Sequence, residues 1–389
     1  MTREEFETLC RDDVRRTVAD NCGRDPLDVA LDRRVPHAAL VATQVKYLRR
    51  ARTKLPSYRA AQCILPPRAF EQASSEECAA HKEMSGAAAL DLTCGLGVDA
   101  LALSRRFGRV VTLERDPVLA DIAACNLRRL GAGNVEVVCA SAEAYLTAAT
   151  ERFDWVYADP DRRSETGRRQ VRLEACSPDV LQLRPAIRRC SSRFCLKCSP
   201  LFDVDEARRL FPEARIEAVS LGGECKELLV YDDGTGPSLT ATALGADSVT
   251  LPPDGTAPAP PETFEPTAYG YLFVPDAALQ KMRLARRALV GRADMWSGNG
   301  FAFARRPVEG VPGRTMEIAS VAAFDPKELR RRLRGTGAEV LLRDFPLPLD
   351  ELYARTGLRP GRQRRLAFTR IAGRMWTIEL KNESANHHG

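Results

Sequence analysis

The sequence has no apolar run near the length that a membrane helix requires. A bilayer span takes about 20 consecutive apolar residues, and charged or polar residues interrupt every apolar stretch here before that length. The opening stretch, MTREEFETLC, is acidic and polar, unlike a secretory signal. These absences argue against an integral membrane protein, and we expect a cytoplasmic protein with no membrane partner.

Histidine is also scarce, which bears on metal binding. The four histidines, at positions 37, 81, 387 and 388, share no ligand spacing with carboxylates or cysteines. Most of the twelve cysteines lie in apolar contexts typical of buried thiols in a reducing compartment. The CxxC spacing of Cys195 and Cys198 lacks a second ligand pair and lies in a predicted strand, where positions three apart face opposite sides. We therefore expect no metal.

The net charge of +6 is unevenly distributed. Residues 279–376 contain 21 Lys and Arg against 9 Asp and Glu, so the rest of the chain is net acidic. A basic C-terminal third indicates a polyanion partner. A solvated, arginine-rich surface without a partner is the alternative interpretation.

The chain of 389 residues is too long for one ordinary core, so we expect several domains. Helical periodicity over residues 1–80 predicts a helical N-terminal domain, in which RAFEQASSEECAAHKEM forms one more helix. Residues 81–251 alternate short apolar runs with helical segments. Residues 252–266, rich in Pro and Ala, predict a linker. Residues 267–389 predict a helical connector and a small basic α+β domain.

The middle of the chain predicts an α/β fold. Five strand–helix pairs in succession indicate a parallel sheet covered on both faces. The stretch RIEAVSLGGECKELLVYDD then forms two extended segments around Gly222 and Gly223, which predicts an antiparallel pair. On its second segment we expect Glu224, Lys226 and Glu227 to face solvent along an edge strand.

A glycine-rich turn follows the first predicted strand, in LDLTCGLGVDALALS. Gly95 and Gly97 allow a ligand to approach the backbone where the next helix begins. The following strand ends at Glu114, 23 residues after Asp91. An acid at about this spacing commonly binds ribose hydroxyls. The combination predicts a cofactor that contains a nucleoside.

The acids at this turn distinguish between cofactors. Asp99, directly after the glycines, is a poor neighbour for the pyrophosphate of a dinucleotide, and Asp91 lies beside the same turn. Both suit a ligand that carries an ammonium group. S-adenosylmethionine has an amine, a carboxylate and a ribose, so it fits these acids better than NAD does.

The sequence resembles the class I S-adenosylmethionine-dependent methyltransferases. LDLTCGLG is similar to their first motif, although Thr93 replaces a usual glycine, and Glu114 is similar to their ribose-binding acid. SAEAYL corresponds to the third motif, with Ser141 in place of a usual aspartate, and ADPDRR to the fourth. The cofactor-binding residues expected on this basis are Asp91, Thr93, Gly95, Gly97, Asp99, Glu114, Arg115, Ser141, Ala142 and Asp159.

The resemblance narrows to bacterial methyltransferases with a C-terminal THUMP-like domain. It extends over most of residues 60–380 and rests on RAFEQASSEECAAHK, DLTCGLGVDALALS, ADPDRR, LKCSPLFDVDEA and GECKELLVY. It implies a Rossmann-like class I sheet between a helical N-terminal domain and a THUMP-like α+β domain. Because THUMP domains are associated with RNA, it also implies modification of RNA, either tRNA or rRNA, by an RNA-binding enzyme that we expect to be monomeric.

The stretch DPDRR is the expected reaction centre. Methyl transfer from a sulfonium is an in-line displacement that depends on positioning and electrostatics. Asp159 can orient a nucleophile or accept its proton, or it can simply cap a turn that Pro160 shapes. Amino-methylating relatives have Pro and an aromatic residue where this chain has Asp161 and Arg162, so the methylated atom stays open. No cysteine lies in this loop, which argues against pyrimidine-C5 chemistry.

The remaining site predictions follow from the same loop and its neighbours. The expected catalytic residues are Asp159, Pro160, Asp161 and Arg163. The expected substrate-binding residues are Arg162, Arg168, Arg169 and Lys197. In the C-terminal domain, strand spacing predicts that Phe345, Phe368 and Trp376 belong to the core. Two other functions remain open: a protein or small-molecule methyltransferase, and a non-catalytic RNA-binding protein with a degenerate methyltransferase fold.

Overall fold

The computed structural model describes residues 1–161 and 173–382. It divides into two compact units, which are described separately: Met1–Arg215 with Glu227–Gly236, and Ile216–Lys226 with Pro237–Gly389. We call them unit 1 and unit 2. Within the described ranges, none of the helices combines the length and the apolar character that crossing a membrane takes.

The first part of unit 1 is helical, as predicted. Its helices are α1 (Arg3–Cys10), α2 (Asp12–Asn21), α3 (Pro26–Leu31), α4 (Ala38–Lys54), α5 (Pro56–Ala60), α6 (Pro67–Gln72) and α7 (Glu76–His81). The prediction of a single helix over RAFEQASSEECAAHKEM is wrong, because α6 and α7 are separate. The Ser75 hydroxyl accepts a hydrogen bond from the Cys78 N–H and caps α7, and Ala73 is extended, so the chain starts a new helix there.

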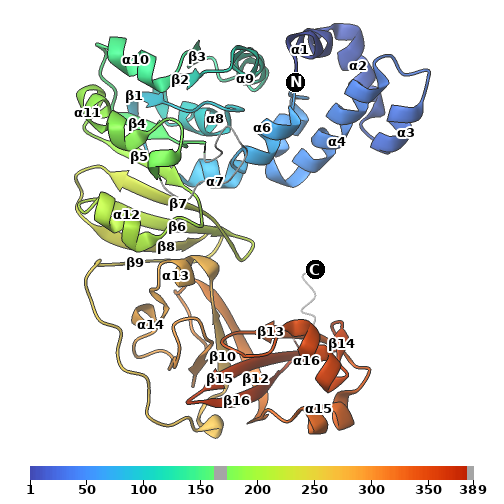
Figure 1. The fold of residues 1–389 in the computed structure, drawn as a ribbon, viewed down its shortest axis with the longest axis vertical. Coiled ribbons are helices and arrows are strands. Elements are labelled where there is room, and N and C mark those ends of the chain that lie inside the picture. Colours follow the sequence, from blue (N-terminus) through green and yellow to red (C-terminus); the bar gives the residue numbers. More distant parts are fainter. Residues whose placement is uncertain (162–172, 383–389) are drawn as a thin grey trace. The chain divides into compact units, whose positions relative to one another are not determined.

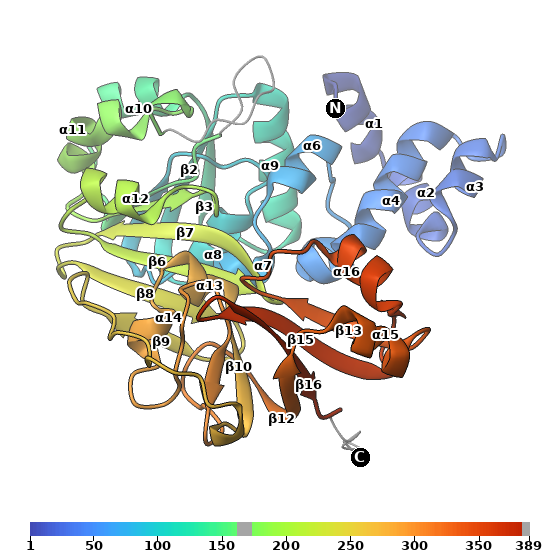
Figure 2. The same cartoon turned by 60° about the horizontal axis from the view of Figure 1, so that its bottom comes forward.

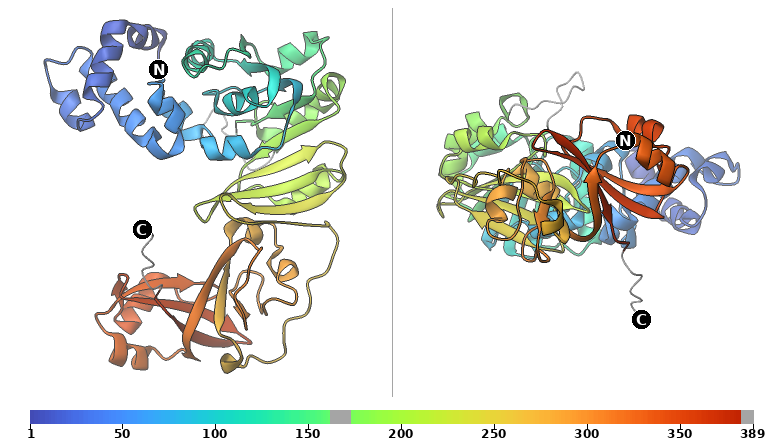
Figure 3. Two further views of the ribbon diagram at one scale, coloured as in Figure 1. Left: turned by 180° about the vertical axis from the view of Figure 1, so that it is seen from behind. Right: turned by 90° about the horizontal axis from the view of Figure 1, so that it is seen from below.

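These helices share a core with the α/β part of the chain. Val41, Val45 and Leu48 of α4 belong to the same apolar cluster as Leu101 of α8 (Val98–Ser104) and Ile122 of α9 (Pro117–Arg129). Helices α1 to α4 gather on the α9 side of unit 1, away from α10 and α11 (Figures 1 and 3). The structure therefore has no break between two cores near residue 80.

The sheet of unit 1 has the order β3-β2-β1-β4-β5-β7. Its strands are β1 (Gly86–Asp91), β2 (Phe107–Glu114), β3 (Val135–Cys139), β4 (Trp155–Ala158), β5 (Phe194–Cys198) and β7 (Glu224–Asp232). All pairs are parallel except β5 with β7. The connecting helices are α8, α9, α10 (Ala142–Ala148), η1 (Leu173–Ala175), α11 (Val180–Cys190) and α12 (Val204–Leu210). The strand order reverses between β1 and β4, where α/β proteins bind their ligands.

Unit 2 contains a sheet of seven strands in the order β11-β10-β12-β16-β15-β13-β14. These are β10 (Tyr271–Pro275), β11 (Ala302–Ala304), β12 (Gly313–Ala323), β13 (Gly337–Leu342), β14 (Arg359–Pro360), β15 (Arg364–Ile371) and β16 (Arg374–Leu380). The unit also contains η2 (Pro266–Ala268), α13 (Ala277–Lys281), α14 (Ala285–Ala288), α15 (Pro326–Leu333) and α16 (Leu349–Thr356). Helices α15 and α16 lie together near β13 (Figure 2). Phe345, Phe368 and Trp376 all pack in apolar clusters, as predicted.

The Pro-rich segment lies within unit 2 and follows β6 (Arg215–Leu221), β8 (Ser238–Ala243) and β9 (Ser248–Leu251). It contains no helix or strand before η2. Its carbonyl oxygens accept hydrogen bonds from Arg286 and Arg287 of α14 and from the Trp296 indole, which lies 2.9 Å from the Pro261 oxygen. The segment is thus held against its own unit, which the chain enters for the last time at Pro237.

Candidate active site

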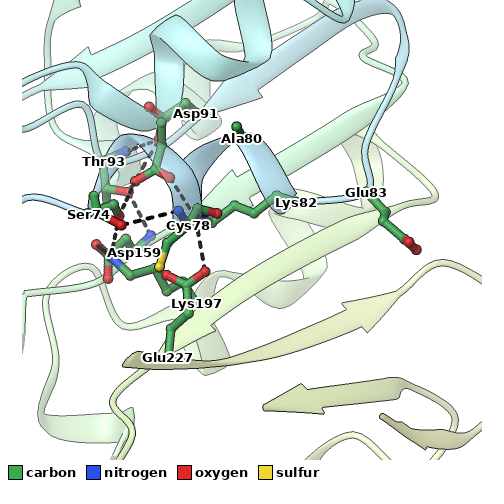
Figure 4. A network of polar contacts seen from close by, with 12 residues as sticks. Ser74, Cys78, Ala80, Lys82, Glu83, Asp91, Thr93, Asp159, Lys197 and Glu227 are labelled. Atoms are coloured by element: carbon green, nitrogen blue, oxygen red, sulfur yellow. Dashed lines mark hydrogen bonds and ion pairs between the residues drawn. The ribbon is translucent and has the colours of Figure 1, made fainter. Parts of the chain in front are cut away.

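A threonine connects the ends of β1 and β4 in the centre of the sheet. The Thr93 hydroxyl accepts a hydrogen bond from the Asp159 N–H at 2.7 Å and donates one to an Asp91 carboxylate oxygen at 3.3 Å (Figure 4). A glycine at this position, as the resembling family usually has, would lack the hydroxyl. Thr93 therefore fixes the start of the DPDRR loop relative to the glycine-rich turn.

Asp91 is fully buried at the end of β1. Its carboxylate also accepts hydrogen bonds from the Thr93 N–H at 2.9 Å and from the Thr112 hydroxyl at 2.7 Å. Burial raises the pKa of Asp91 to about 7, against the lowering effect of these hydrogen bonds. Asp91 is an internal support of the turn.

The raised pKa of Asp91 makes the free energy of unfolding depend on pH, and this dependence can be measured. Between its ordinary pKa of 3.8 and about 7, the folded protein keeps a proton that the unfolded chain releases. The contribution of Asp91 to the free energy of unfolding is therefore complete below about pH 4 and is lost as the pH rises towards 7. We expect Asp91→Asn to flatten the fall in stability between pH 5 and 8 in urea denaturation. Asp28→Asn, at an exposed position, should keep the wild-type slope.

The glycine-rich turn and Glu114 form one hydrogen-bonded unit. The Gly95 N–H donates to one Glu114 carboxylate oxygen at 3.0 Å, and the Asp116 N–H donates to the other at 2.9 Å. Gly97 has a φ of +84° where α8 begins, and a Cβ there would lie 3.2 Å from Leu127. Since a carboxylate offers about four lone-pair sites, Glu114 has about two left to accept ribose hydroxyls. These residues fit the nucleoside part of S-adenosylmethionine.

Asp99 differs from its predicted environment. Instead of being open to a ligand ammonium, its carboxylate lies 2.7 Å from the Lys82 ammonium and accepts a hydrogen bond from the Ser74 hydroxyl at 2.9 Å. Burial alone would raise the pKa of Asp99, but Lys82 and Lys197 outweigh it and lower that pKa. Asp99 is thus an ionised group whose partner comes from the chain itself.

Asp159 belongs to a group of two buried lysines and three carboxylates, of which Figure 4 labels Lys82, Lys197, Asp159 and Glu227. Lys82 lies between Asp99 and Glu227, 3.3 Å from the latter, and both side chains of this second pair are 2% exposed. Lys197 of β5 forms an ion pair with Asp159 and donates to the Ser74 hydroxyl at 2.9 Å. We call Ser74, Lys82, Asp99, Asp159, Lys197 and Glu227 the buried charge cluster.

Glu227 was expected to face solvent, and this prediction is wrong. The second half of β7 is buried, because β7 pairs with β5 rather than lying at an exposed edge. Glu224 and Lys226, in the first half, are exposed, as predicted. Ser74 and Lys82 were also missed, although the quoted motif RAFEQASSEECAAHK contains both. Their only signal in the sequence was that the resembling family shares this motif.

Asp161 lies apart from the cofactor turn and contacts helix α6. Its carboxylate is 3.4 Å from the Arg68 guanidinium and accepts a hydrogen bond from the Gln72 amide at 3.3 Å. Its backbone N–H and carbonyl both pair with Ser177, and Arg115 donates to the Ser177 hydroxyl at 3.0 Å. Asp161 and Arg115 thus both form hydrogen bonds with Ser177.

Three further predicted residues lie at the borders of the site. The Ser141 hydroxyl accepts from the Ala144 N–H at 3.2 Å and so caps α10, while Ala142 is buried. Pro160 and Lys197 line a small cavity at the carboxyl ends of β4 and β5, together with Leu173, Cys176, Ser199 and Phe202. Lys197 is buried, and its ammonium contacts Asp159 and Ser74 of the chain itself.

Four predicted arginines, Arg162, Arg163, Arg168 and Arg169, lie outside the described residues. In the part of the chain that the structure describes, no three or more His, Cys, Asp or Glu side chains come together in a way that could hold a metal ion.

Comparisons with known proteins agree with this geometry. A family model described as a methyltransferase domain matches residues 89–174, and one described as THUMP domain-like matches residues 313–382. Two uncharacterized S-adenosylmethionine-dependent methyltransferases, from Mycobacterium tuberculosis strains CDC 1551 and H37Rv, are each 29% identical over 336 residues, or 83% of this chain and 90% of theirs. A solved structure from Porphyromonas gingivalis W83, described as a candidate methyltransferase, is 24% identical with a TM-score of 0.83 and shares the fold over 99% of this chain and 100% of its own.

The sheet order, the glycine-rich turn and the acid that ends β2 define a methyltransferase of the class I fold. More particularly, the chain is an S-adenosylmethionine-dependent methyltransferase with a C-terminal THUMP-like domain. The sequence predicted both the class and its cofactor.

Glu114 provides a direct test of where the cofactor binds. Glu114→Ala removes a charged acceptor of hydrogen bonds, each worth about 1.5–3 kcal/mol. We therefore expect the Kd for S-adenosylmethionine, measured by calorimetry, to rise about 10- to 100-fold. Glu136→Ala in the adjacent strand β3, where the side chain pairs with Arg109 at the surface, should leave the Kd unchanged. If both variants bound S-adenosylmethionine with the same affinity, its ribose would not be bound by Glu114.

Proposed function

We propose that this methyltransferase modifies RNA, with tRNA and rRNA as the candidate substrates. The observation that carries the proposal is the match of the C-terminal domain to a THUMP-like family model. This domain lies in a basic part of the sequence, where 21 Lys and Arg stand against 9 Asp and Glu over residues 279–376. Excess positive charge on such a domain favours binding of a phosphate backbone.

In this proposal the cofactor lies over the carboxyl ends of β1 and β2. Glu114 accepts the ribose hydroxyls, and the turn at Gly95 and Gly97 keeps the backbone close to the ligand. Bound S-adenosylmethionine supplies an electrophilic methyl group on a sulfonium. Asp91 and Thr93 keep the turn in register with the DPDRR loop. Ser141 and Ala142 border the nucleoside from α10, and the cap at Ser141 leaves backbone groups there to contact adenine.

Asp159 orients the target atom in this proposal. Burial alone would lower the pKa of Lys197, but Asp159, Asp99 and Glu227 raise it, so the ammonium stays protonated at neutral pH. This ammonium forms an ion pair with the Asp159 carboxylate, whose remaining lone pairs can accept a hydrogen bond from another donor. Asp159 therefore accepts a hydrogen bond from an N–H of the target and aligns its lone pair for displacement. A base nitrogen meets this requirement better than a hydroxyl, because its lone pair can form the N–CH3 bond while the S–CH3 bond breaks, and it releases its surplus proton to water only afterwards.

The loop residues around Asp159 complete the proposed site. Pro160 lines the small cavity beside Lys197, which at about 10 Å³ has room for no more than a water molecule, so its role is to shape the loop. Asp161 is held by Arg68 and Gln72, so its role is to position the loop. On sequence grounds, Arg162, Arg163, Arg168 and Arg169 remain the proposed contacts to the base and to phosphates.

The test compares modified nucleosides from cells with and without the gene. RNA is separated into size classes, digested and analysed by mass spectrometry, and the purified enzyme then methylates RNA from the deletion strain with labelled S-adenosylmethionine. One methylated nucleoside that disappears in the deletion and returns in vitro supports the proposal. An unchanged profile in every class favours a protein or small-molecule substrate. Failure of calorimetry to detect cofactor binding at millimolar concentration would indicate a non-catalytic RNA-binding protein.

A further inference from the structure

A long stretch of the N-terminal helices contains no acidic residue. Residues 33–70 hold nine Lys and Arg and not one Asp or Glu, although the chain as a whole has 58 basic and 52 acidic residues. The stretch forms α4, α5 and most of α6. Such a separation of charge produces a positive potential that a mixed surface lacks.

The basic side chains of α4 and α5 are exposed and lie close together. Lys46, Arg49 and Arg50 share one face of α4, because they are three and four residues apart. Arg49 and Arg59 line the same surface cavity of about 290 Å³. We define the α4–α5 basic surface as Lys46, Arg49, Arg50, Arg52 and Arg59, all of which are exposed.

Carboxylates compensate only part of this charge. Arg50 forms an ion pair with Glu71, and Arg49 lies 3.8 Å from Asp25. Both pairs are about half exposed to solvent and so contribute little. Within residues 1–161 and 173–382, no carboxylate forms an ion pair with the other three members of the surface. The five positive charges of the surface are therefore offset by only two carboxylates, and solvent screens both of these ion pairs.

The α4–α5 basic surface is continuous with the reaction loop inside unit 1. The Arg50–Glu71 pair joins α4 to α6, and Lys54 donates to the Phe70 carbonyl at 2.6 Å. At the other side of α6, the exposed Arg68 reaches Asp161, two residues after Asp159. A polyanion on α4 can thus continue along α6 to the loop without leaving this unit.

We propose that the α4–α5 basic surface binds the phosphate backbone of the substrate RNA and guides it to the DPDRR loop. The inference rests on the proposed function and adds a second binding surface, within the catalytic unit, to the THUMP-like domain. Arginine forks match the geometry of phosphate oxygens, and no aromatic side chain belongs to the surface. The contacts should therefore be independent of sequence and sensitive to salt.

Binding of a fluorescent 30-nucleotide poly(U) by the full chain tests this inference without requiring activity. Lys46→Glu/Arg52→Glu/Arg59→Glu reverses three charges on the surface. We expect the Kd at 0.1 M salt to rise about 10- to 100-fold, and the slope of log Kd against log salt to fall by about 2, since each contact to a single strand contributes about 0.7. Thermal melting and calorimetry with S-adenosylmethionine should match the wild type, since none of the three residues contacts the site.

A matched control shows whether weaker RNA binding depends on where the reversed charges lie or only on the net charge of the protein. Arg105→Glu/Arg152→Glu/Arg189→Glu changes three exposed positions elsewhere in unit 1 by the same total charge, and its Kd should change less than about 3-fold. Equal weakening of both triple variants, or wild-type affinity of the first, would overturn the proposal. So would stronger loss of poly(glutamate) binding than of poly(U) binding, which would indicate an acidic protein. The first variant can lose poly(U) binding even though the wild type methylates no RNA. That result would support the α4–α5 basic surface as an RNA-binding surface and would contradict the proposed function.

Discussion

Replacement of Asp159 by asparagine is expected to lower the rate of methyl transfer by about 10²-fold, the usual cost of misaligning a reacting group. The amide keeps the shape of the carboxylate and the backbone hydrogen bond to Thr93, but its nitrogen cannot accept a hydrogen bond from the target. The Kd for S-adenosylmethionine should stay within a few-fold of the wild type, because the cofactor turn is intact. Single-turnover transfer of label to RNA from a deletion strain measures the rate.

The variant also leaves Lys197 without its carboxylate, so a structural effect must be separated from a catalytic one. Asp159→Asn/Lys197→Met removes both charges and should regain much of the lost stability while methyl transfer stays low. Asp20→Asn, at an exposed position on α2, should behave as the wild type in both measurements. Retention of more than a tenth of the wild-type rate by Asp159→Asn would remove Asp159 from the catalytic role.

Lys82→Met is expected to reduce the free energy of unfolding by about 3–5 kcal/mol. Lys82 is fully buried between Asp99 and Glu227, and methionine fills a similar volume without the charge. Two buried carboxylates would then keep only the more distant influence of Lys197, and burial would raise the pKa of both. Because carboxyl groups with a raised pKa bind protons more tightly in the folded state, the loss should shrink as the pH falls from 8 to 5. Urea denaturation at these pH values measures it.

Two further variants show whether the lost stability comes from charge. Lys82→Met/Asp99→Asn/Glu227→Gln neutralises the whole group and should recover most of the stability, since a buried ion pair contributes little beyond an uncharged replacement. Lys226→Met lies one residue before Glu227 but is exposed, so its effect should stay within about 0.5 kcal/mol. A loss in the triple variant as large as in Lys82→Met would mean that packing, not charge, is decisive.

Local sequence patterns predicted most of the helices and strands, because the spacing of apolar residues largely determines which of the two a segment forms. The alternation of apolar runs and helices gave the five strand–helix pairs, and the basic C-terminal part contains both strands and helices, as its sequence predicted. Asp91, Thr93, Gly95, Glu114 and Asp159 are brought together at the carboxyl ends of neighbouring strands. Parallel strands bring distant motifs to one edge, which is why spacing along the chain was informative.

The buried charge cluster could not be predicted in the same way. Lys82 and Glu227 are far apart in the sequence, and nothing in either neighbourhood indicates a partner. In GECKELLVY, alternation of charge favours an exposed strand, and only the pairing of β7 with β5 shows that Glu227 is covered. The break between α6 and α7 depends on the Ser75 cap, which competes with a run of good helix formers. Tertiary contacts therefore decided the position of Glu227, and a local cap decided where the helix breaks.

The break between α6 and α7 has a consequence for how this enzyme can be divided. It brings Ser74 to Lys197 and to Asp99, and α7 is followed at once by Lys82. A truncated protein beginning at β1 would retain the glycine-rich turn, Glu114 and the DPDRR stretch, yet Asp159 would lose part of its support and the core would be open along α8 and α9. Leu9 of α1 belongs to this same core, so a piece of the chain that keeps the core and the supports of Asp159 must contain the N-terminal helices as well as the sheet.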